Sequence, residues 1–314
     1  MTHGQMKQGD STGKIKQRIS DDVRQRVLDL RRSHSLREVA AMTGLPLGTV
    51  KTLVSRSGKF RDNAKHRELF SLPPIKESEE TLPSVPELPP QENITGDKEV
   101  DAVLWLRQVI STGEASLIST ALEAAKKIKT PLKELEERYR AHLIASNPGQ
   151  MWAALSSFGF ADLEGLATSS IRRKQLQVEA FSRFGEFLLE NTPAESFCIE
   201  TLAGLEPTGS LLEYDNGEVA ERFKARSKLM PQTLADCLYE LDYWGRLYSL
   251  RRAADKDFYD DLPEVEARSS FVFALMAEIR PRDRDEAKAV LNYLLENNCK
   301  DWSGTDAILE NLIG

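Results

Sequence analysis

A proline-rich stretch, residues 71–96, constrains most strongly how this chain can fold. It holds six of the fourteen prolines, spread among Glu, Ser and Thr. Such a stretch cannot bury enough apolar surface to order itself, and its prolines favour an extended backbone. We therefore predict a disordered linker that separates a small N-terminal part from a larger C-terminal domain, residues 97–314. Pro86 and Pro89 also have PxxP spacing, so a proline-rich docking peptide is the alternative interpretation.

The charges are distributed unevenly on the two sides of this stretch. The chain of 314 residues has a net charge of -7. Residues 1–70 hold 15 Lys and Arg against 7 Asp and Glu, a net charge of +8, whereas residues 71–314 have a net charge of -15. A basic N-terminal part joined to an acidic remainder indicates that the N-terminal part contacts a polyanion.

Apolar residues in the C-terminal domain recur at helical spacing, as in the stripe that begins with Leu234, Leu238 and Leu241. Thr192-Pro193-Ala194-Glu195 forms a capping box, and Pro131 and Pro281 mark two further helix starts. Residues 270–275 could form a short buried strand, but the pattern continues in a way that favours a buried helix. Because no convincing period-2 strand occurs, we predict an all-α fold with roughly eight to ten helices in this domain.

The N-terminal part contains signals for three short helices. Ser20 is placed to cap the first one, and Ser35 and Glu38 form a capping box that opens the second. Gly44 ends the second helix because glycine tolerates a left-handed backbone. A third helix follows over residues 47–57.

The segment LREVAAMTGLPLGTVKTLVS resembles the helix-turn-helix superfamily. That pattern needs a tiny residue in its first helix, here Ala40, and a permissive residue in the turn, here Gly44. The third helix is similar to the recognition helix of sigma-factor region 4 and of response-regulator and resolvase-type domains. The resemblance implies a DNA-binding domain over residues 20–70. It also implies four buried apolar positions, which fall on Val39, Leu45, Val50 and Leu53.

A recognition helix lies in the major groove of DNA, where its exposed side chains meet base edges and phosphates. The second helix places Arg37 near the phosphate backbone, aided by the N-terminus of that helix. Basic residues continue after the third helix as far as Lys65 and Arg67. The candidate DNA-binding residues are Arg37, Thr49, Lys51, Thr52, Ser55, Arg56, Lys59 and Arg61.

Residues 1–19 carry four further cations, Lys7, Lys14, Lys16 and Arg18. We interpret them as a flexible basic arm of the kind that enters a minor groove. The alternative interpretation of the whole N-terminal part is a small protein-interaction bundle with a solvated basic surface.

No motif indicates catalysis. HExxH, GxxxxGK[ST] and GxSxG are absent, the four histidines are scattered, and the three cysteines are far apart. We interpret the acidic run 255–266 as a solvated loop rather than a metal site, and residues 172–174 (RRK) as a surface turn rather than a second DNA contact. The aromatic residues between Tyr239 and Tyr248 favour packing on a neighbouring helix, with a partner-binding groove as the alternative. We therefore predict no enzymatic activity, cofactor or metal.

The longest apolar stretch, residues 271–277, is far shorter than the about 20 residues that a membrane helix needs. The first residues are polar and lack the core of a signal peptide. With few cysteines, the chain is expected to be a cytoplasmic protein without a membrane partner.

Together, these observations predict a sequence-specific double-stranded DNA-binding protein, foremost a transcriptional regulator. Its helical C-terminal domain would mediate self-association into a homo-oligomer, or contact another protein such as RNA polymerase. The alternative is an assembly factor of a phage or plasmid that marks a DNA site, such as a small terminase subunit or a replication or partition accessory protein.

Overall fold

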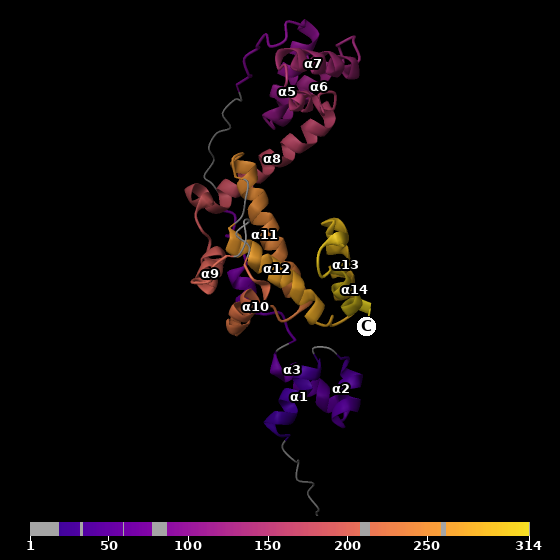
Figure 1. Ribbon diagram of the computed structural model, residues 1–314, viewed down its shortest axis with the longest axis vertical. Coiled ribbons are helices and arrows are strands. Elements are labelled where there is room, and N and C mark those ends of the chain that lie inside the picture. Colours follow the sequence, from indigo (N-terminus) through magenta and orange to yellow (C-terminus); the bar gives the residue numbers. More distant parts are fainter. Residues whose placement is uncertain are drawn as a thin grey trace, which may run out of the picture. The chain divides into compact units, whose positions relative to one another are not determined.

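The fold is entirely helical wherever the structure, a computed structural model, describes the chain (Figure 1). The described residues are 19–31, 34–58, 60–76, 87–207, 214–258 and 262–313. They form fourteen α-helices and four short 3₁₀ helices and contain no β-strand, which confirms the predicted all-α class. Among them, no helix is both long enough and apolar enough to cross a membrane.

Two compact units share the chain, and neither is contiguous in sequence. The first contains residues 1–69, 201–241 and 267–314, and the second contains residues 70–200 and 242–266. The first unit therefore joins the N-terminal residues to two segments of the C-terminal part, a grouping that the predicted linear division does not include.

The α-helices are α1 (Asp21–Arg31), α2 (Leu36–Thr43), α3 (Leu47–Ser57), α4 (Ala64–Leu69), α5 (Lys98–Ser111), α6 (Ala115–Ala125), α7 (Leu132–Ser146), α8 (Leu163–Phe184), α9 (Pro193–Leu202), α10 (Asn216–Ala225), α11 (Leu234–Ala254), α12 (Pro263–Glu278), α13 (Arg284–Glu296) and α14 (Thr305–Ile313).

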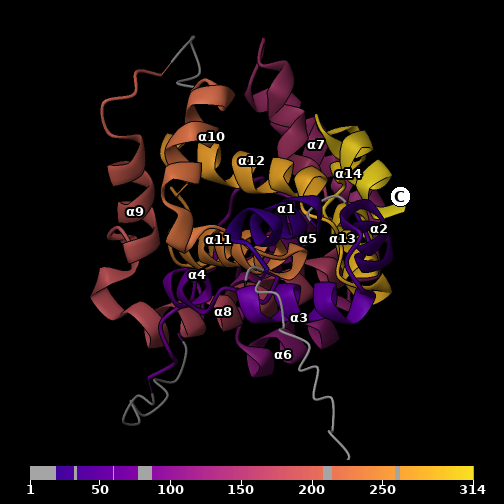
Figure 2. The same cartoon turned by 90° about the horizontal axis from the view of Figure 1, so that it is seen from below.

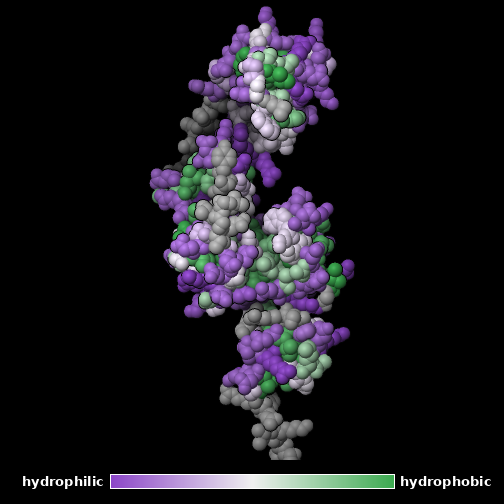
Figure 3. Space-filling view, in the orientation of Figure 1, coloured by the Kyte–Doolittle hydropathy of each residue, from purple (hydrophilic) through white to green (hydrophobic). Residues whose placement is uncertain are grey.

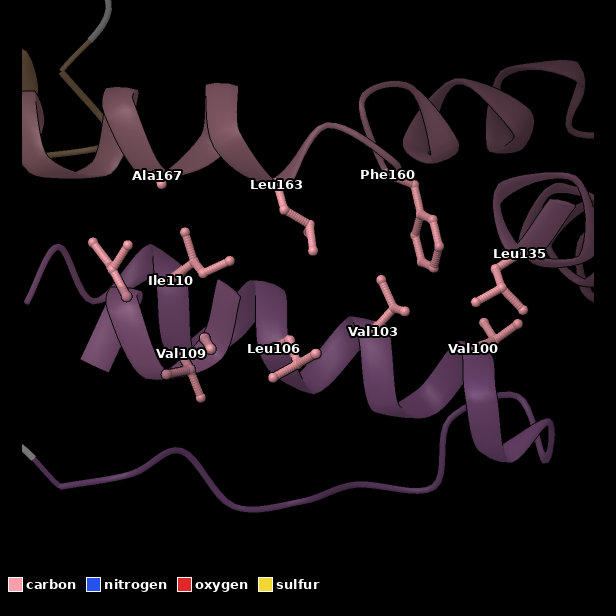
Figure 4. Close-up of a cluster of buried hydrophobic side chains, with 11 residues drawn as sticks. Val100, Val103, Leu106, Val109, Ile110, Leu135, Phe160, Leu163 and Ala167 are labelled. Atoms are coloured by element: carbon pink, nitrogen blue, oxygen red, sulfur yellow. The ribbon is translucent and has the colours of Figure 1, made fainter. Parts of the chain in front are cut away.

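In the second unit, α5 is the central helix of a hydrophobic core. It contacts α6, α7 and α8. Val103 and Ile110 of α5 have no exposed surface, and they lie on the side of α5 that faces Phe160 and Leu163 (Figure 4). The spacing of seven between these two α5 residues keeps them on one face of the helix, and this face is buried.

Both ends of the predicted linker are hydrogen-bonded to helices of the second unit. On the N-terminal side, the backbone N–H of Lys76 donates to the carbonyl of Ser182 at 2.9 Å. On the C-terminal side, the indole N–H of Trp105 donates to the carbonyl of Pro89 at 2.8 Å. The described ends of the linker are thus bound by specific partners, whereas its residues 77–86 lie outside the described part.

In the first unit, a buried carboxylate joins α4, α11 and α12. Glu240 of α11 lies 2.6 Å from the imidazole Nε2 of His66, and it accepts two hydrogen bonds, 2.6 and 2.8 Å long, from the guanidinium of Arg268. All three side chains have no exposed surface. One turn earlier on α11, Asp236 accepts a 2.9 Å hydrogen bond from the backbone N–H of Asn63, just before α4. Helix α4 is therefore fixed to α11 by polar contacts at both its start and its middle.

One segment for which the sequence allowed either a strand or a helix is helical. Residues 270–275 belong to α12, where Val272 and Met276 have no exposed surface, so the buried-helix interpretation is confirmed. Figures 1 and 2 both show α12 beside α11, in agreement with the contact between Arg268 and Glu240.

The interpretation of residues 172–174 as a surface turn is wrong, because they lie in the middle of α8. Asp162 caps this helix, and its buried residues, among them Ala167, Ser170 and Ala180, continue on both sides of the basic triplet. Arg and Lys are good helix formers, so a run of three charges does not interrupt α8.

Two of the aromatic residues of α11 are buried against Phe70, just after α4, whereas Tyr239 is 36% exposed, so the predicted packing on a neighbouring helix is found only in part. Tyr243 and Trp244 are both about 5% exposed, and the ring of Phe70 meets each of them edge to face, with centroids 5.8 and 5.6 Å away. The acidic run 255–266 is only partly a loop, since its last residues form the first turn of α12.

A second buried ion pair lies within the second unit. Arg251 of α11 donates to both oxygens of Glu195, at 2.5 and 3.0 Å, and both side chains are about 5% exposed. Glu195 also accepts from the backbone N–H of Thr192 at 2.6 Å, while the Thr192 hydroxyl accepts from the N–H of Glu195. The predicted capping box of α9 is confirmed, and the same carboxylate binds α9 to α11.

Replacing Arg251 should leave the Glu195 carboxylate buried without its cation. We expect Arg251→Met to lower the free energy of unfolding by about 3–5 kcal/mol. Arg138→Met is the matched control, because the guanidinium of Arg138 is 43% exposed beside Glu134, and this variant should cost less than about 1 kcal/mol. Urea denaturation of both variants measures the difference, and equal effects would contradict the assignment.

The same pair should make stability depend on pH. Burial raises the pKa of Glu195, but the hydrogen bonds from Arg251 and Thr192 outweigh it, so the pKa is lowered. A lowered carboxyl pKa contributes stability above the unfolded-state pKa of about 4.3, and the contribution is lost as the pH falls through the folded-state pKa. The difference in stability between wild type and Glu195→Gln should therefore be constant near neutral pH and shrink below about pH 4. A difference that stays constant down to about pH 3 in denaturation titrations would contradict this.

Candidate nucleic-acid interface

Helices α1, α2 and α3 form a small bundle, residues 20–58, which we call the N-terminal bundle. Each of the three helices contacts the other two (Figures 1 and 2). Val27, Val39 and Val50, one from each helix, have no exposed surface. Leu45 and Leu53 are half-buried against these valines, so all four predicted apolar positions belong to the core of the bundle.

The connection between α2 and α3 has the predicted local structure. Ser35 and Glu38 form a capping box at the start of α2, and Gly44 follows α2 with a φ of 67°, in the left-handed region. Ala40 is half-buried and packs against the valine core. Because Gly44 reverses the chain within three residues, α3 begins at once and lies against both preceding helices.

The face of α3 opposite Val50 is polar and basic. Lys51, Thr52, Ser55 and Arg56 are exposed, and Thr49 is half-buried at its edge. Both hydrophilic and hydrophobic side chains are exposed on the visible side of the bundle (Figure 3). Five of the eight predicted site residues therefore lie on one helix.

Local hydrogen bonds already engage two hydroxyl groups on this face of α3. The Thr52 hydroxyl donates to the carbonyl of Gly48 at 2.8 Å, so Thr52 presents a methyl group and acceptor lone pairs. The guanidinium of Arg61 donates to the Ser55 hydroxyl at 3.4 Å, which brings a further exposed cation to the end of α3. Lys59 lies outside the described residues.

Arg37 is exposed in the first turn of α2, as predicted. The predicted help from the helix N-terminus is countered by Glu38, whose carboxylate accepts a 2.7 Å hydrogen bond from the backbone N–H of Ser35. The hydrogen bonds of Glu38 with the backbone and the hydroxyl of Ser35 lower the pKa of its carboxyl group. The carboxylate is therefore ionised, and a negative charge already lies at this end of α2. A phosphate contact here would therefore rely on the guanidinium of Arg37 rather than on the helix N-terminus.

The basic residues that follow α3 do not form one continuous surface. Lys65 is exposed, but Arg67 lies 2.9 Å from Asp62 and 2.9 Å from Asp236. The predicted extension of the basic tract to Arg67 is therefore wrong, because two carboxylates hold this guanidinium within the first unit. Residues 1–18 of the predicted arm lie outside the described part.

Elsewhere, the described residues contain no group of three or more His, Cys, Asp or Glu arranged to hold a metal ion. The cysteines, Cys198, Cys237 and Cys299, are all buried. Burial raises the pKa of the Cys237 and Cys299 thiols, so these two groups are poorer nucleophiles than an exposed cysteine.

Comparisons of the chain with models of protein families, with curated proteins and with solved structures find no match.

The turn between α2 and α3 can be tested with two glycines that differ in backbone conformation. An added Cβ meets nothing within 4 Å at Gly44 or at Gly48, so only the backbone distinguishes them. Gly44→Ala should destabilise α2 and α3 by about 1 kcal/mol, since a left-handed backbone disfavours L-residues. Gly48→Ala lies within α3 and should stabilise these helices by about 0.5–1 kcal/mol. Amide hydrogen exchange of the full chain measures both local effects, and a stabilising Gly44→Ala would contradict the turn.

Proposed function

We propose that this protein binds double-stranded DNA through the exposed face of α3, inserted into the major groove. The observation that carries the proposal is the division of α3 into two faces. Val50 is buried in the N-terminal bundle, whereas Lys51, Thr52, Ser55 and Arg56 are exposed on the same helix. The major groove of DNA is wide enough to admit an α-helix, and the exposed residues of α3 are types that pair with base edges.

The chemistry of this face suits both phosphates and bases. Lys51 and Arg56 can contact phosphates or the acceptors of guanine, and the Thr52 methyl can contact thymine. Arg37, exposed on α2, and Arg61, exposed after α3, would contact the DNA backbone. The net charge of +8 on residues 1–70 also supports DNA binding, because neutralising the phosphates supplies most of a protein's nonspecific affinity for DNA.

The proposed biological role is that of a transcriptional regulator. A single bundle of three helices reads only a few base pairs, so useful affinity and specificity require a second copy on a neighbouring half-site. The remainder of the chain, whose net charge is -15 over residues 71–314, is unsuited to contact DNA over a wide surface. Its proposed task is self-association or contact with another protein such as RNA polymerase.

The proposal is tested by removing two positive charges from α3. Lys51→Ala with Arg56→Ala should weaken binding of the full chain to a mixed-sequence duplex at least about 30-fold at moderate salt, since each contact contributes about 1–3 kcal/mol. Lys127→Ala with Lys129→Ala is the matched control, because it removes the same charge from exposed positions after α6. Fluorescence anisotropy measures both. Equal affinities for the two double variants would contradict the proposal.

A further inference from the structure

A cavity of about 480 Å³ lies within the second unit, away from the N-terminal bundle in sequence. Ile94 and three residues of α5, Leu104, Arg107 and Ser111, form part of its wall. The wall also includes Arg173, from the middle of α8, and Lys256, which follows α11. The cavity is wide open to solvent, and its volume falls within the range of small-molecule sites.

Three cations line the cavity, and its lining residues include no carboxylate. Arg173 donates to the carbonyl of Ser111 at 2.8 Å, and Arg107 donates to the carbonyl of Phe160 at 3.0 Å. Both guanidiniums are thus held in place by neutral backbone oxygens, and neither forms an ion pair with a carboxylate that the structure describes. Lys256 is exposed and makes no hydrogen bond or ion pair with any residue that the structure describes.

Convergence of like charges is unfavourable unless an anion offsets it. Asp162 and Glu136 lie outside the cavity lining and raise the pKa of Arg107. Burial of the guanidinium has the larger effect, so the pKa of Arg107 is lowered. The three cations come from positions 107, 173 and 256, far apart in sequence, so no local helix requirement explains their convergence.

We propose that this cavity binds a small phosphorylated molecule, such as a sugar phosphate or a mononucleotide. The planar fork of an arginine matches the oxygens of a phosphate, and a phosphate monoester carries nearly two negative charges at neutral pH. A phosphate dianion offsets three cations better than the single negative charge of a carboxylate would. Ile94 and Leu104 supply apolar surface for the organic part, and the volume exceeds the needs of a bare phosphate.

The proposal is independent of DNA binding by α3 and is tested on the full chain by isothermal titration. The probes are AMP and glucose 6-phosphate, each compared with its unphosphorylated counterpart, and inorganic phosphate. At least one phosphorylated probe should bind, and its counterpart should not. Lys256→Ala should weaken that binding about tenfold or more, because a hydrogen bond to a charged group is lost.

Arg172→Ala is the matched control, because Arg172 is an exposed cation on α8 that does not line the cavity, and it should bind like wild type. The double variant Lys51→Ala with Arg56→Ala should also bind the small probes normally, which separates this site from α3. Binding of no probe at about 10 mM, or equal losses in Lys256→Ala and Arg172→Ala, would overturn the proposal. Loss of duplex DNA binding in Lys256→Ala without any binding of the small probes would also overturn it and assign these cations to DNA.

Discussion

The first unit depends on a carboxylate with no exposed surface. Glu240 pairs with Arg268 of α12 and lies 2.6 Å from His66 of α4, so one side chain of α11 contacts two other helices. Moving such a charge out of water costs several kcal/mol unless its partners are arranged to compensate. Burial raises the pKa of Glu240, but Arg268 and His66 outweigh it and lower the pKa, which keeps the group ionised. The three helices can therefore pack only in an arrangement that satisfies this charge.

This constraint bears on the N-terminal bundle. Helix α3 ends at Ser57, and Asn63 already donates its backbone N–H to Asp236. The bundle is thus followed after a few residues by a segment bound to α11, not by a long free tether. Only a short stretch of chain therefore separates the proposed DNA contact on α3 from the contact between Asn63 and α11.

Local signals predicted local structure well. The capping boxes at Ser35 and Thr192 and the left-handed Gly44 each involve residues no more than three positions apart, and all are found as predicted. Long-range contacts could not be predicted in this way, because nothing in the spacing of residues connects Asn63 to Asp236 or Arg107 to Lys256. For the same reason, helical spacing predicted that Thr49, Lys51, Thr52, Ser55 and Arg56 share one helix face, but it could not predict that two carboxylates hold Arg67.

The central claim, that α3 contacts DNA, is tested most directly by photo-crosslinking from single labelled cysteines. The three native cysteines are buried, so an introduced exposed cysteine can be labelled selectively. A photoreactive group on Ser55→Cys, in the exposed face of α3, should crosslink to a duplex, while the same group on Thr120→Cys, exposed on α6, should not. Crosslinking from Thr120→Cys alone, or from neither position under conditions where the protein binds the duplex, would contradict the account.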